Sequence, residues 1–428
     1  MLIEFSVTNF RSFREKQTLS LATSRYFKDR VEQNCFDTEI KGLPKLLRSI
    51  AIYGPNASGK SNLVSALSFM RYMVLSSAKK IQEGEELNVV PFLLDQASKE
   101  RESEFEIIFI EGGIRFQYGF ALDKMRIHSE WLIAYPEGRP QRWFERKYNH
   151  ETKKDTYEFG SKFLGGRLRE DWKNATRSNA LFLSVAVQFN SEQLKPLYLW
   201  FQKSLRVIPH RVSLSPQYTC DTCETEEGKK KMLDFLNAAD LSIADIRIDK
   251  KRFSYEDLPK GMPDKLKEGL LKKLEGKDIQ DIKFMHKNSE TAELVPFAAE
   301  YESDGTLNLF SFAGPWLDVI GNDKILFVDE IDSSLHPLVV HQMVRLLHGS
   351  GGKAQLVFTT HDTTILGQDI LRRDQIWFVE KDESNASKLY PLSDLNVREH
   401  EALERGYLRG RYGAIPVIKE LLPGAKSG

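Results

Sequence analysis

The feature that most constrains the fold is the segment Gly54–Ser61, which reads GPNASGKS and fits the pattern GxxxxGK[ST] at every position. A short apolar run, Ser49–Tyr53, leads directly into it, and Leu63, Leu67 and Met70 recur at helical spacing after it. This order of strand, glycine-rich loop and helix points consecutive backbone N–H groups and a helix N-terminus at phosphate oxygens. We therefore predict a phosphate-binding loop between a buried parallel strand and a helix that packs on a sheet.

The chemistry of such a loop assigns roles to individual residues. Lys60 would reach the β- and γ-phosphates, and the Ser61 hydroxyl would hold Mg²⁺. The sequence does not distinguish adenine from guanine. The residues expected to bind the nucleotide are Asn56, Ala57, Ser58, Gly59, Lys60, Ser61 and Asn62.

A second apolar run, Ile325–Val328, ends in the acidic pair Asp329 and Glu330. A phosphate-binding loop that supports hydrolysis needs a carboxylate at the end of a neighbouring strand to bind Mg²⁺. It also needs a group that polarises the attacking water. We predict Asp329 for the first role and Glu330 for the second. The alternative is an acidic strand end that caps the next helix.

Two further segments offer groups that could reach a phosphate. Ser303, Asp304 and Gly305 open a helical pattern and supply a hydroxyl and a helix N-terminus. A strand at Leu356–Phe358 runs into Thr-Thr-His-Asp, where His361 could hydrogen-bond a γ-phosphate. A lone histidine is, however, more often structural.

The fold class follows from the order of the apolar runs. Helix-length segments separate Ile325–Val328, Leu356–Phe358 and Ile376–Val379, which is the rhythm of a parallel α/β sheet. Residues 104–120 form two β-rich runs around a Gly-Gly turn, which predicts an antiparallel hairpin. We expect an α/β fold with a mainly parallel sheet, an antiparallel β subdomain and a helical insertion.

Three regions are predicted on this basis. An N-terminal lobe covers 1–120 and a C-terminal lobe covers 296–428. Between them, 121–295 is a partly helical middle region with leucines at helical spacing over 266–274, which we interpret as a partner or dimer surface.

Composition excludes several classes of protein. The chain has 61 Lys and Arg against 61 Asp and Glu, which argues against a globally basic nucleic-acid coat and against an acidic tail. Three cysteines are too few for a disulfide scaffold and favour a reducing cytoplasm. The longest apolar-looking run, Leu181–Phe189, is about half of the ~20 residues that span a bilayer. We expect a cytoplasmic protein without a membrane segment.

The order of the motifs resembles the ABC-type ATPases of the SMC, RecF and OLD group. Within that group it is most similar to the RloA/AbiL-type (AriA-like) ATPases of bacterial phage-defence systems. The resemblance covers both ends of the chain, about 1–75 and 300–416, and the middle only loosely. It rests on NFRSF, GPNASGKS, ESDGT, ILFVDEID, SLHP and TTHD, and on the closing segments QIWFVEKD and YLRGRYGAIP.

The resemblance implies a P-loop NTPase fold of the ABC type that binds and hydrolyses ATP with Mg²⁺. It would make Ser303, Asp304 and Gly305 a signature motif that completes the nucleotide site of a second subunit. Asp332 would lie in the D-loop, and His361 would be the switch histidine. The signature is the shortened SDGT rather than the longer Gly-Gly-Gln form.

Two consequences follow from the same resemblance. Gln117 is the candidate Q-loop ligand of the metal, with an ordinary strand position as the alternative. A signature that reads another subunit's nucleotide needs two composite sites, so we expect a homodimer or a higher even-numbered assembly that ATP holds together.

Two weaker signals remain open. Cys220 and Cys223 form a lone CxxC pair, but zinc takes four ligands, so we do not expect zinc there unless a second chain contributes. The basic stretches 139–147 and 250–277 could contact nucleic acid, although solvated helix faces have the same composition.

The family pattern also indicates what this chain lacks. OLD-type relatives carry a TOPRIM nuclease after the ATPase, and Phe378-Val379-Glu380 resembles its first strand. Only 48 residues follow Glu380, and none forms Asp-x-Asp. We therefore expect an ATPase that controls a separate effector, a TOPRIM-type nuclease on another chain, in anti-phage defence or abortive infection.

Two alternatives stay open. One is a DNA-repair or chromosome-maintenance ATPase of the RecF/SMC kind that clamps DNA. The other is a nucleotide-binding scaffold with negligible turnover, which Glu330 disfavours.

Overall fold

The computed structural model describes residues 1–209, 214–239, 241–252, 263, 266–267, 269, 278–333, 335–368, 370–397 and 402–415. The helical pattern expected over 266–274 lies largely outside these residues. The chain divides into two compact units. The first unit comprises Met1–Arg211, Val319–Ser333 and Val340–Gly428, and the second comprises Val212–Asp318 and Ser334–Val339. The three-region division made from the sequence stays a prediction.

A six-stranded sheet in the first unit carries the motif-bearing strands, in the order β11-β15-β16-β5-β17-β18. Neighbours pair in parallel except for the antiparallel pair β17 and β18. Every residue of β5, β15 and β16 is buried, which explains why these strands read as continuous apolar runs. The predicted mainly parallel sheet is confirmed. Its strands are β5 (Ser49–Tyr53), β11 (Leu205–Ile208), β15 (Ile325–Val328), β16 (Gln355–Thr359), β17 (Ile376–Lys381) and β18 (Ser387–Pro391).

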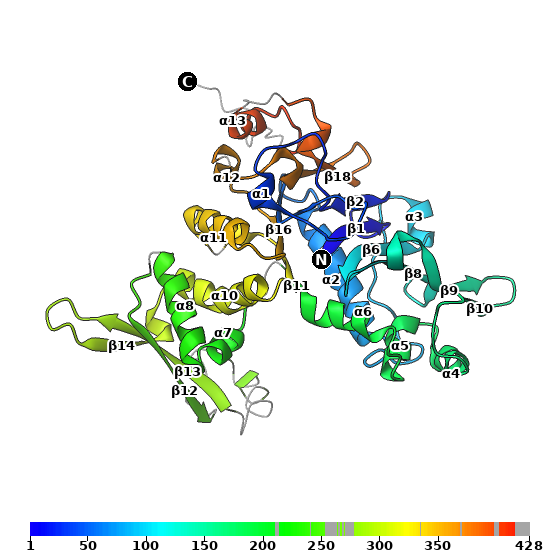
Figure 1. The fold of residues 1–428 in the computed structure, drawn as a ribbon, viewed down its shortest axis with the longest axis horizontal. Coiled ribbons are helices and arrows are strands. Elements are labelled where there is room, and N and C mark those ends of the chain that lie inside the picture. The colour runs from blue at the N-terminus through cyan, green and yellow to red at the C-terminus, as the bar shows by residue number, and fades with distance from the viewer. Residues whose placement is uncertain are drawn as a thin grey trace. The chain divides into compact units, whose positions relative to one another are not determined.

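A seven-stranded antiparallel sheet forms the other half of the first unit, in the order β10-β9-β8-β7-β6-β1-β2 (Figure 1). The predicted hairpin is confirmed: β6 and β7 pair across the Gly112-Gly113 turn, where both residues have positive φ. The sheet is larger than the sequence indicated. Its strands are β1 (Leu2–Thr8), β2 (Gln17–Ser20), β6 (Ser103–Glu111), β7 (Ile114–Leu122), β8 (Ile127–Tyr135), β9 (Gln141–Asn149) and β10 (Lys154–Phe159).

The helix that follows the glycine-rich loop, α2 (Lys60–Ser76), joins the two sheets through one hydrophobic core. Its residues Leu63, Leu67 and Met70 are fully buried, as their spacing predicted. Phe69 on the same helix lies 5.9 Å from the ring centroid of Phe10 and 5.2 Å from that of Phe105 on β6. The loop that precedes α2 is therefore anchored by both sheets.

Shorter elements complete the first unit. Two-residue strands β3 (Cys35–Phe36) and β4 (Leu46–Leu47) pair with each other. The remaining helices are α1 (Val31–Asn34), α3 (Gln96–Glu100), α4 (Leu168–Ala175), α5 (Phe182–Gln188), α6 (Lys195–Leu199), most of α11 (Pro337–Gly349), α12 (Thr364–Gly367) and α13 (Leu403–Leu408).

The closing segment around α13 packs against the end of the parallel sheet. The ring of Tyr407 lies 5.6 Å from that of Tyr53, the last residue of β5, and 5.5 Å from that of Phe378 on β17. Tyr412 stacks on Phe378 at 6.0 Å. A side chain at Gly406 would overlap the Tyr412 hydroxyl. Gly406, which directly precedes YLRGRYG, thus allows Tyr412 to join an aromatic cluster beside the phosphate loop.

The second unit combines helices with a three-stranded antiparallel sheet, in the order β12-β13-β14. Phe284 on β13 packs edge-on against Phe310 on α10, with centroids 5.2 Å apart. The sequence predicted helices in this region but not this sheet. Its elements are α7 (Gln217–Thr222), α8 (Glu226–Ala238), β12 (Asp245–Arg252), β13 (Asp278–Lys287), β14 (Leu294–Ala298) and most of α10 (Asp304–Gly321).

A proline lies inside α10 and is accommodated by a neighbouring helix. Pro315 has no N–H to donate within the helix. The Thr219 hydroxyl from α7 donates to the Phe310 carbonyl at 2.8 Å and accepts the Gly314 N–H at 3.1 Å. This bridge fixes α7 against the middle of α10.

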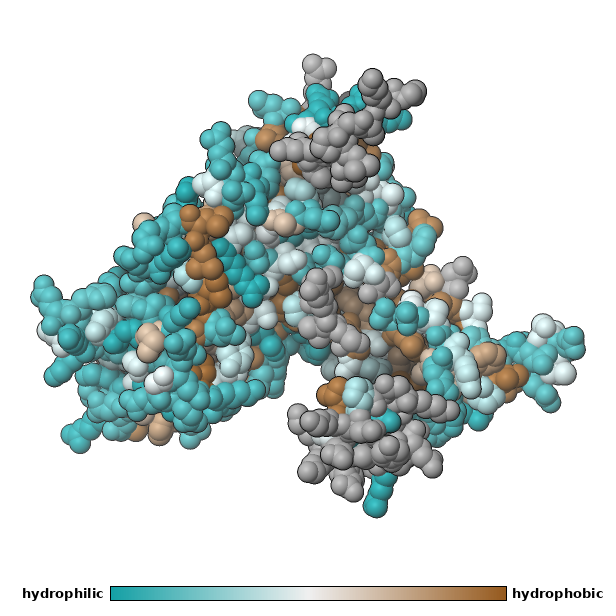
Figure 2. All heavy atoms as spheres, turned by 180° about the vertical axis from the view of Figure 1, so that it is seen from behind, coloured by the Kyte–Doolittle hydropathy of each residue, from teal (hydrophilic) through white to brown (hydrophobic). Residues whose placement is uncertain are grey.

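The molecular surface is mostly polar on the face that Figure 2 shows, with hydrophobic residues in small groups. Within the residues that the structure describes, none of the helices is long and apolar enough to cross a membrane.

Candidate nucleotide-binding site

The glycine-rich loop connects the end of β5 to the start of α2, and its two glycines are required by close packing. A Cβ at Gly54 would overlap the carbonyl oxygen of Val379 on β17. A Cβ at Gly59, where φ is +118°, would overlap the hydroxyls of Ser387 and Ser12. Glycine is the residue that fits both close approach and positive φ. The loop conformation is thus set by β17, β18 and the segment after β1.

Lys60 lies inside this loop. Its Nζ donates to the carbonyl oxygens of Gly54 at 2.7 Å and Pro55 at 3.2 Å. Burial lowers the pKa of Lys60 below its ordinary value, while the carboxylates of Glu330, Asp329 and Asp332 act to raise it. A partly desolvated cation at the centre of a loop of backbone N–H groups favours an anionic ligand.

Ser58 provides a test of whether a nucleotide fits here. Its Oγ is buried and has no hydrogen-bond partner among the described residues. A buried polar atom without a partner is costly, and a phosphate oxygen would supply one. Asn56 and Ala57 are exposed at the tip of the loop, and Ser61 is half-buried in the first turn of α2. The donor set fits a bound phosphate group.

Asn62 is engaged with the protein itself. Its Nδ2 donates to the Ser12 hydroxyl at 2.8 Å, and its Oδ1 accepts from Arg11 at 3.4 Å. The hydroxyl of Ser387 on β18 donates to Ser12 Oγ at 2.8 Å and also to the Ser58 carbonyl. Ser12 and Ser387 therefore support the loop, and the sequence analysis missed both. Ser12 lies in the NFRSF segment, which could have signalled it, whereas Ser387 has no local motif.

The acidic pair lies at the carboxyl end of β15, and β16 separates β15 from β5. Thr359, the last residue of β16, donates its hydroxyl to Asp329 Oδ1 and accepts the Glu330 N–H, both at 2.7 Å. Asp329 is buried, and Glu330 has a positive φ of 51°. Thr359 thus holds both carboxylate residues in place. Its role was not foreseen, although it begins the TTHD segment.

Asp332 and His361 meet at the same edge of the sheet. The backbone N–H of His361 donates to Asp332 Oδ2 at 3.1 Å. Burial lowers the pKa of His361, as does the positive charge of Lys60, while Asp332 opposes the change. The imidazole is therefore neutral near pH 7 and can donate through one ring nitrogen. Asp332 Oδ1 is buried without a hydrogen-bond partner in the described part of the chain.

Five of the predicted residues lie close together in the first unit. Their proximity is evident from the effect of their charges on the pKa values of Lys60 and His361. They come from the carboxyl ends of three neighbouring strands, which is where α/β sheets place their ligands. The five are Lys60, Asp329, Glu330, Asp332 and His361.

Gln117 and the signature residues are not among these five. Gln117 is on β7, where its amide donates to Glu106 at 2.8 Å and accepts from the Tyr135 hydroxyl at 3.0 Å. Its Q-loop role stays a prediction. Ser303, Asp304 and Gly305 belong to the second unit and are exposed at the start of α10. The Ser303 hydroxyl accepts the N–H of the fourth residue of the motif, Thr306, at 3.1 Å. Their place in a composite site also stays a prediction.

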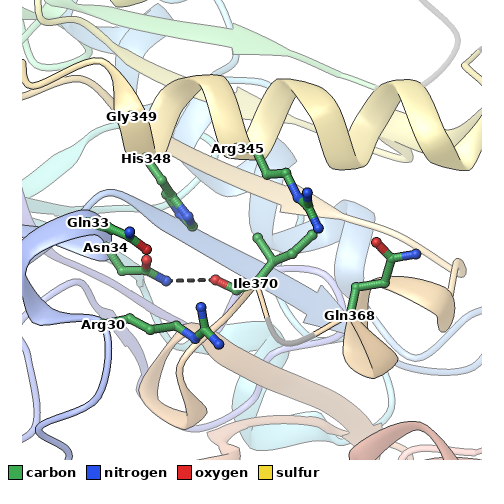
Figure 3. Close-up of a pocket in the computed structure, with 8 residues that line it drawn as sticks. All are labelled: Arg30, Gln33, Asn34, Arg345, His348, Gly349, Gln368 and Ile370. Atoms are coloured by element: carbon green, nitrogen blue, oxygen red, sulfur yellow. Dashed lines mark hydrogen bonds between the residues drawn. The ribbon is translucent and has the colours of Figure 1, made fainter.

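A separate polar pocket of about 460 Å³ opens at the other end of the parallel sheet (Figure 3). His348 from α11 forms a 2.8 Å hydrogen bond with Ser49, the first residue of β5. The phosphate loop follows Tyr53, the last residue of the same strand. Burial, with Arg48 and Arg30 nearby, lowers the pKa of His348 to about 4. This pocket is therefore distinct from the candidate nucleotide site. Its lining residues are Arg30, Gln33, Asn34, Arg345, His348, Gly349, Gln368 and Ile370.

The cysteine pair and part of the basic stretch 139–147 are buried in the structure. Cys220 and Cys223 are buried, and burial raises the pKa of the Cys220 thiol to about 12 and that of Cys223 to about 11. Burial thus disfavours the thiolate that binds zinc. In the stretch 139–147, Trp143 and Phe144 are core residues, and Arg146 is fully buried.

Arg146 donates to the carbonyl of Ala180 at 2.7 Å and pairs with Asp155 at 2.8 Å. The interpretation of 139–147 as a nucleic-acid contact is therefore wrong for Trp143, Phe144 and Arg146, which are buried. Most of 250–277 lies outside the described residues.

The fold and the site define a P-loop nucleotide-binding protein of the α/β class. The family model described as "AAA domain, putative AbiEii toxin, Type IV TA system" matches residues 49–367, and the chain belongs to this family. It is therefore an ATPase of the AAA type. A search of the curated proteins found no match.

Solved structures of SMC heads are similar to the chain. One is titled "Crystal structure of the SmcHead bound to the C-winged helix domain of ScpA", with a TM-score of 0.40 and 12% identity over 91% of this chain and 97% of that chain. Another is the "SMC head domain from Thermotoga maritima", with a TM-score of 0.39 and 14% identity over 92% of this chain and 99% of that chain.

Proposed function

We propose that this protein is a cytoplasmic, Mg²⁺-dependent ATPase of the ABC type, close to the RloA/AbiL-type (AriA-like) defence ATPases, whose ATP-bound assembly controls a separate effector. The observation that carries the catalytic part is the cluster at the carboxyl edge of the parallel sheet. Lys60, Asp329 and Glu330 lie there together, with Asp332 and His361 on the adjoining loops.

Four residues of the cluster, Lys60, Asp329, Glu330 and His361, have a role in the reaction. Lys60 exchanges its carbonyl partners for phosphate oxygens. Ser61 and Asp329 would hold Mg²⁺, which would neutralise part of the phosphate charge. Glu330 accepts the proton of the attacking water. The Thr359 hydroxyl keeps Glu330 in place by accepting the Glu330 backbone N–H at 2.7 Å. His361, neutral near pH 7, donates a hydrogen bond to the γ-phosphate.

The signature motif supports an assembly of two subunits. Ser303, Asp304 and Gly305 are exposed at the N-terminus of an 18-residue helix. An exposed helix N-terminus that carries a hydroxyl suits the γ-phosphate of another copy's nucleotide. ATP would then stabilise the dimer or higher even-numbered form, and hydrolysis would release it.

The effector and the defensive role rest on the resemblance and on the family description, which names a putative toxin of a toxin–antitoxin system. We assign the effector to another chain as a TOPRIM-type nuclease. DNA is not required as a ligand in this proposal, and the burial of Arg146 and Trp143 removes one surface that had favoured it.

The deciding experiment is a paired pull-down from the native host with two variants. Glu330→Gln should trap ATP, and Lys60→Ala should not bind it. We expect one nuclease-like protein to be enriched with only one of the two variants, and ATP-dependent dimers with Glu330→Gln in light scattering. Enrichment of DNA with Glu330→Gln and of no protein would favour the repair-type clamp instead. Absence of ATP turnover in the wild type would favour the scaffold.

A further inference from the structure

Three side chains with metal-binding atoms, none of them assigned to the nucleotide site, meet at one end of the seven-stranded sheet. Glu102 precedes β6, His128 is the second residue of β8, and His150 follows β9. Because neighbouring strands are antiparallel, the start of β6, the start of β8 and the end of β9 lie at the same edge. One ligand atom from each of the three residues, a carboxylate oxygen or an imidazole nitrogen, lies within 4.8 Å of the other two.

His128 is oriented by a neighbouring carboxylate. Its Nε2 is 2.7 Å from Oδ2 of Asp123, which follows β7. Asp123 is itself fixed, because its Oδ1 accepts the backbone N–H groups of Met125 at 2.6 Å and Arg126 at 2.9 Å. A carboxylate that holds one ring nitrogen and leaves the other for a ligand is the usual outer-shell arrangement of metal-binding histidines.

The other ring nitrogen faces the cluster. His128 Nδ1 is buried and has no hydrogen-bond partner among the residues described, and Oε1 of Glu102 is 3.5 Å away. The ring of His150 stacks on that of His128, with centroids 5.5 Å apart and planes 22° from parallel. His150 is exposed on the turn between β9 and β10. An acceptor-capable nitrogen, a carboxylate and a second imidazole therefore surround one point.

Arg126, two residues before His128, is engaged outside the cluster. The guanidinium of Arg126 lies 3.3 Å above the ring of Tyr148 and pairs with Asp155 at 2.6 Å. It is therefore held by groups other than the carboxylate of Glu102.

We propose that Glu102, His128 and His150 bind a Zn²⁺ ion, with Asp123 as the residue that positions His128. Two imidazole nitrogens and one carboxylate oxygen form a donor set that Zn²⁺ takes, with water or another ligand in a fourth position. Bonds of about 2.1 Å place donor atoms about 3.4 Å apart, so the side chains close in slightly. The exposed His150 can make that movement. The ion ties together the ends of β6, β8 and β9.

The test uses the full-length protein without a histidine tag, stripped with EDTA and then given Zn²⁺ alone. Bound metal is measured by mass spectrometry, and affinity by competition with a chromophoric chelator. We expect one tight Zn²⁺ per chain. Affinity should fall by at least about 100-fold in His150→Gln and in Glu102→Gln, and by about 10–100-fold in Asp123→Asn.

Two control variants make the result specific. Glu151→Gln removes an exposed acid from the same turn and should leave the affinity unchanged. A double change, Cys220→Ser with Cys223→Ser, should also retain zinc, because these thiols belong to the second unit. Circular dichroism confirms that each variant folds. Zinc that persists in His150→Gln, that is lost with the cysteines, or that never binds the wild type would overturn the proposal.

Discussion

The two sheets of the first unit place their polar chemistry differently. In the parallel sheet β5 and β15 are fully buried, and reactive groups follow their ends in the short contiguous motifs Gly54–Ser61 and Asp329-Glu330. In the antiparallel sheet polar groups are spread over distant strands, so Glu102, His128 and His150 meet only through pairing. The first arrangement can be recognised from the sequence, and the second requires the fold.

The largest expected effect tests the parallel sheet. Glu330→Gln should retain ATP binding but lower turnover by about 10²–10⁴-fold, because the variant loses the group that accepts the proton of water. ATP affinity is measured by calorimetry and turnover by phosphate release. Turnover equal to that of the wild type would remove the assignment of Glu330 as the base.

The next effect tests whether charges of the antiparallel sheet are structural. Arg146→Ala should destabilise the protein by about 3–5 kcal/mol, because it leaves the buried Glu130 without its cation and Asp155 with Arg126 as its remaining arginine partner. The matched change Arg142→Ala removes an exposed arginine, so its cost should stay below about 1 kcal/mol. Thermal or urea unfolding measures both. A stable Arg146→Ala that loses DNA affinity would restore the nucleic-acid interpretation.

A third effect concerns His348, at the end of the parallel sheet opposite the phosphate loop. The pKa of His348 is lowered to about 4 in the folded protein from an ordinary 6.5, so the unfolded chain binds a proton first as pH falls. Stability should therefore decrease by up to about 3 kcal/mol as pH falls from about 6.5 to about 4. Melting temperatures across this range are compared between wild type and His348→Gln. An equal pH dependence in the two proteins would contradict the prediction.

The smallest effect sharpens the role of the strand between the two motifs. Thr359→Ala removes the hydroxyl that joins Asp329 to the Glu330 N–H and should cost about 1–3 kcal/mol of stability. Turnover should fall more than ATP affinity does. Thr359→Ser keeps the hydroxyl and serves as the control. If alanine and serine behave alike, the hydroxyl does not position the acidic pair.

The sequence predicted the parallel sheet well, because buried parallel strands read as apolar runs and the phosphate loop has a fixed local pattern. It proposed Lys60, Asp329, Glu330 and His361 as site residues from such patterns, and these residues lie close enough in the structure for their charges to interact. It missed Ser387, whose contact with Ser12 joins residues 375 positions apart, because such contacts leave no local signal.

The half-buried strands β8 to β10 escaped prediction for a related reason. Their alternation of exposed and buried residues is short and is mixed with charges such as Arg146, which the pattern assigns to the surface. Burial of that arginine depends on Asp155 and the Ala180 carbonyl, which come from other elements. Composition could therefore suggest a basic surface where the fold has a core.

The aromatic cluster beside the phosphate loop has a consequence for the order of biosynthesis. Tyr53 ends the strand that leads into GPNASGKS, yet Phe378, Tyr407 and Tyr412 complete its surroundings. On the ribosome, the segment GPNASGKS is therefore synthesised long before the residues Phe378, Tyr407 and Tyr412 that pack beside it. Competence to bind nucleotide should appear late in synthesis, after the closing segment has packed, so partial chains would not compete for ATP.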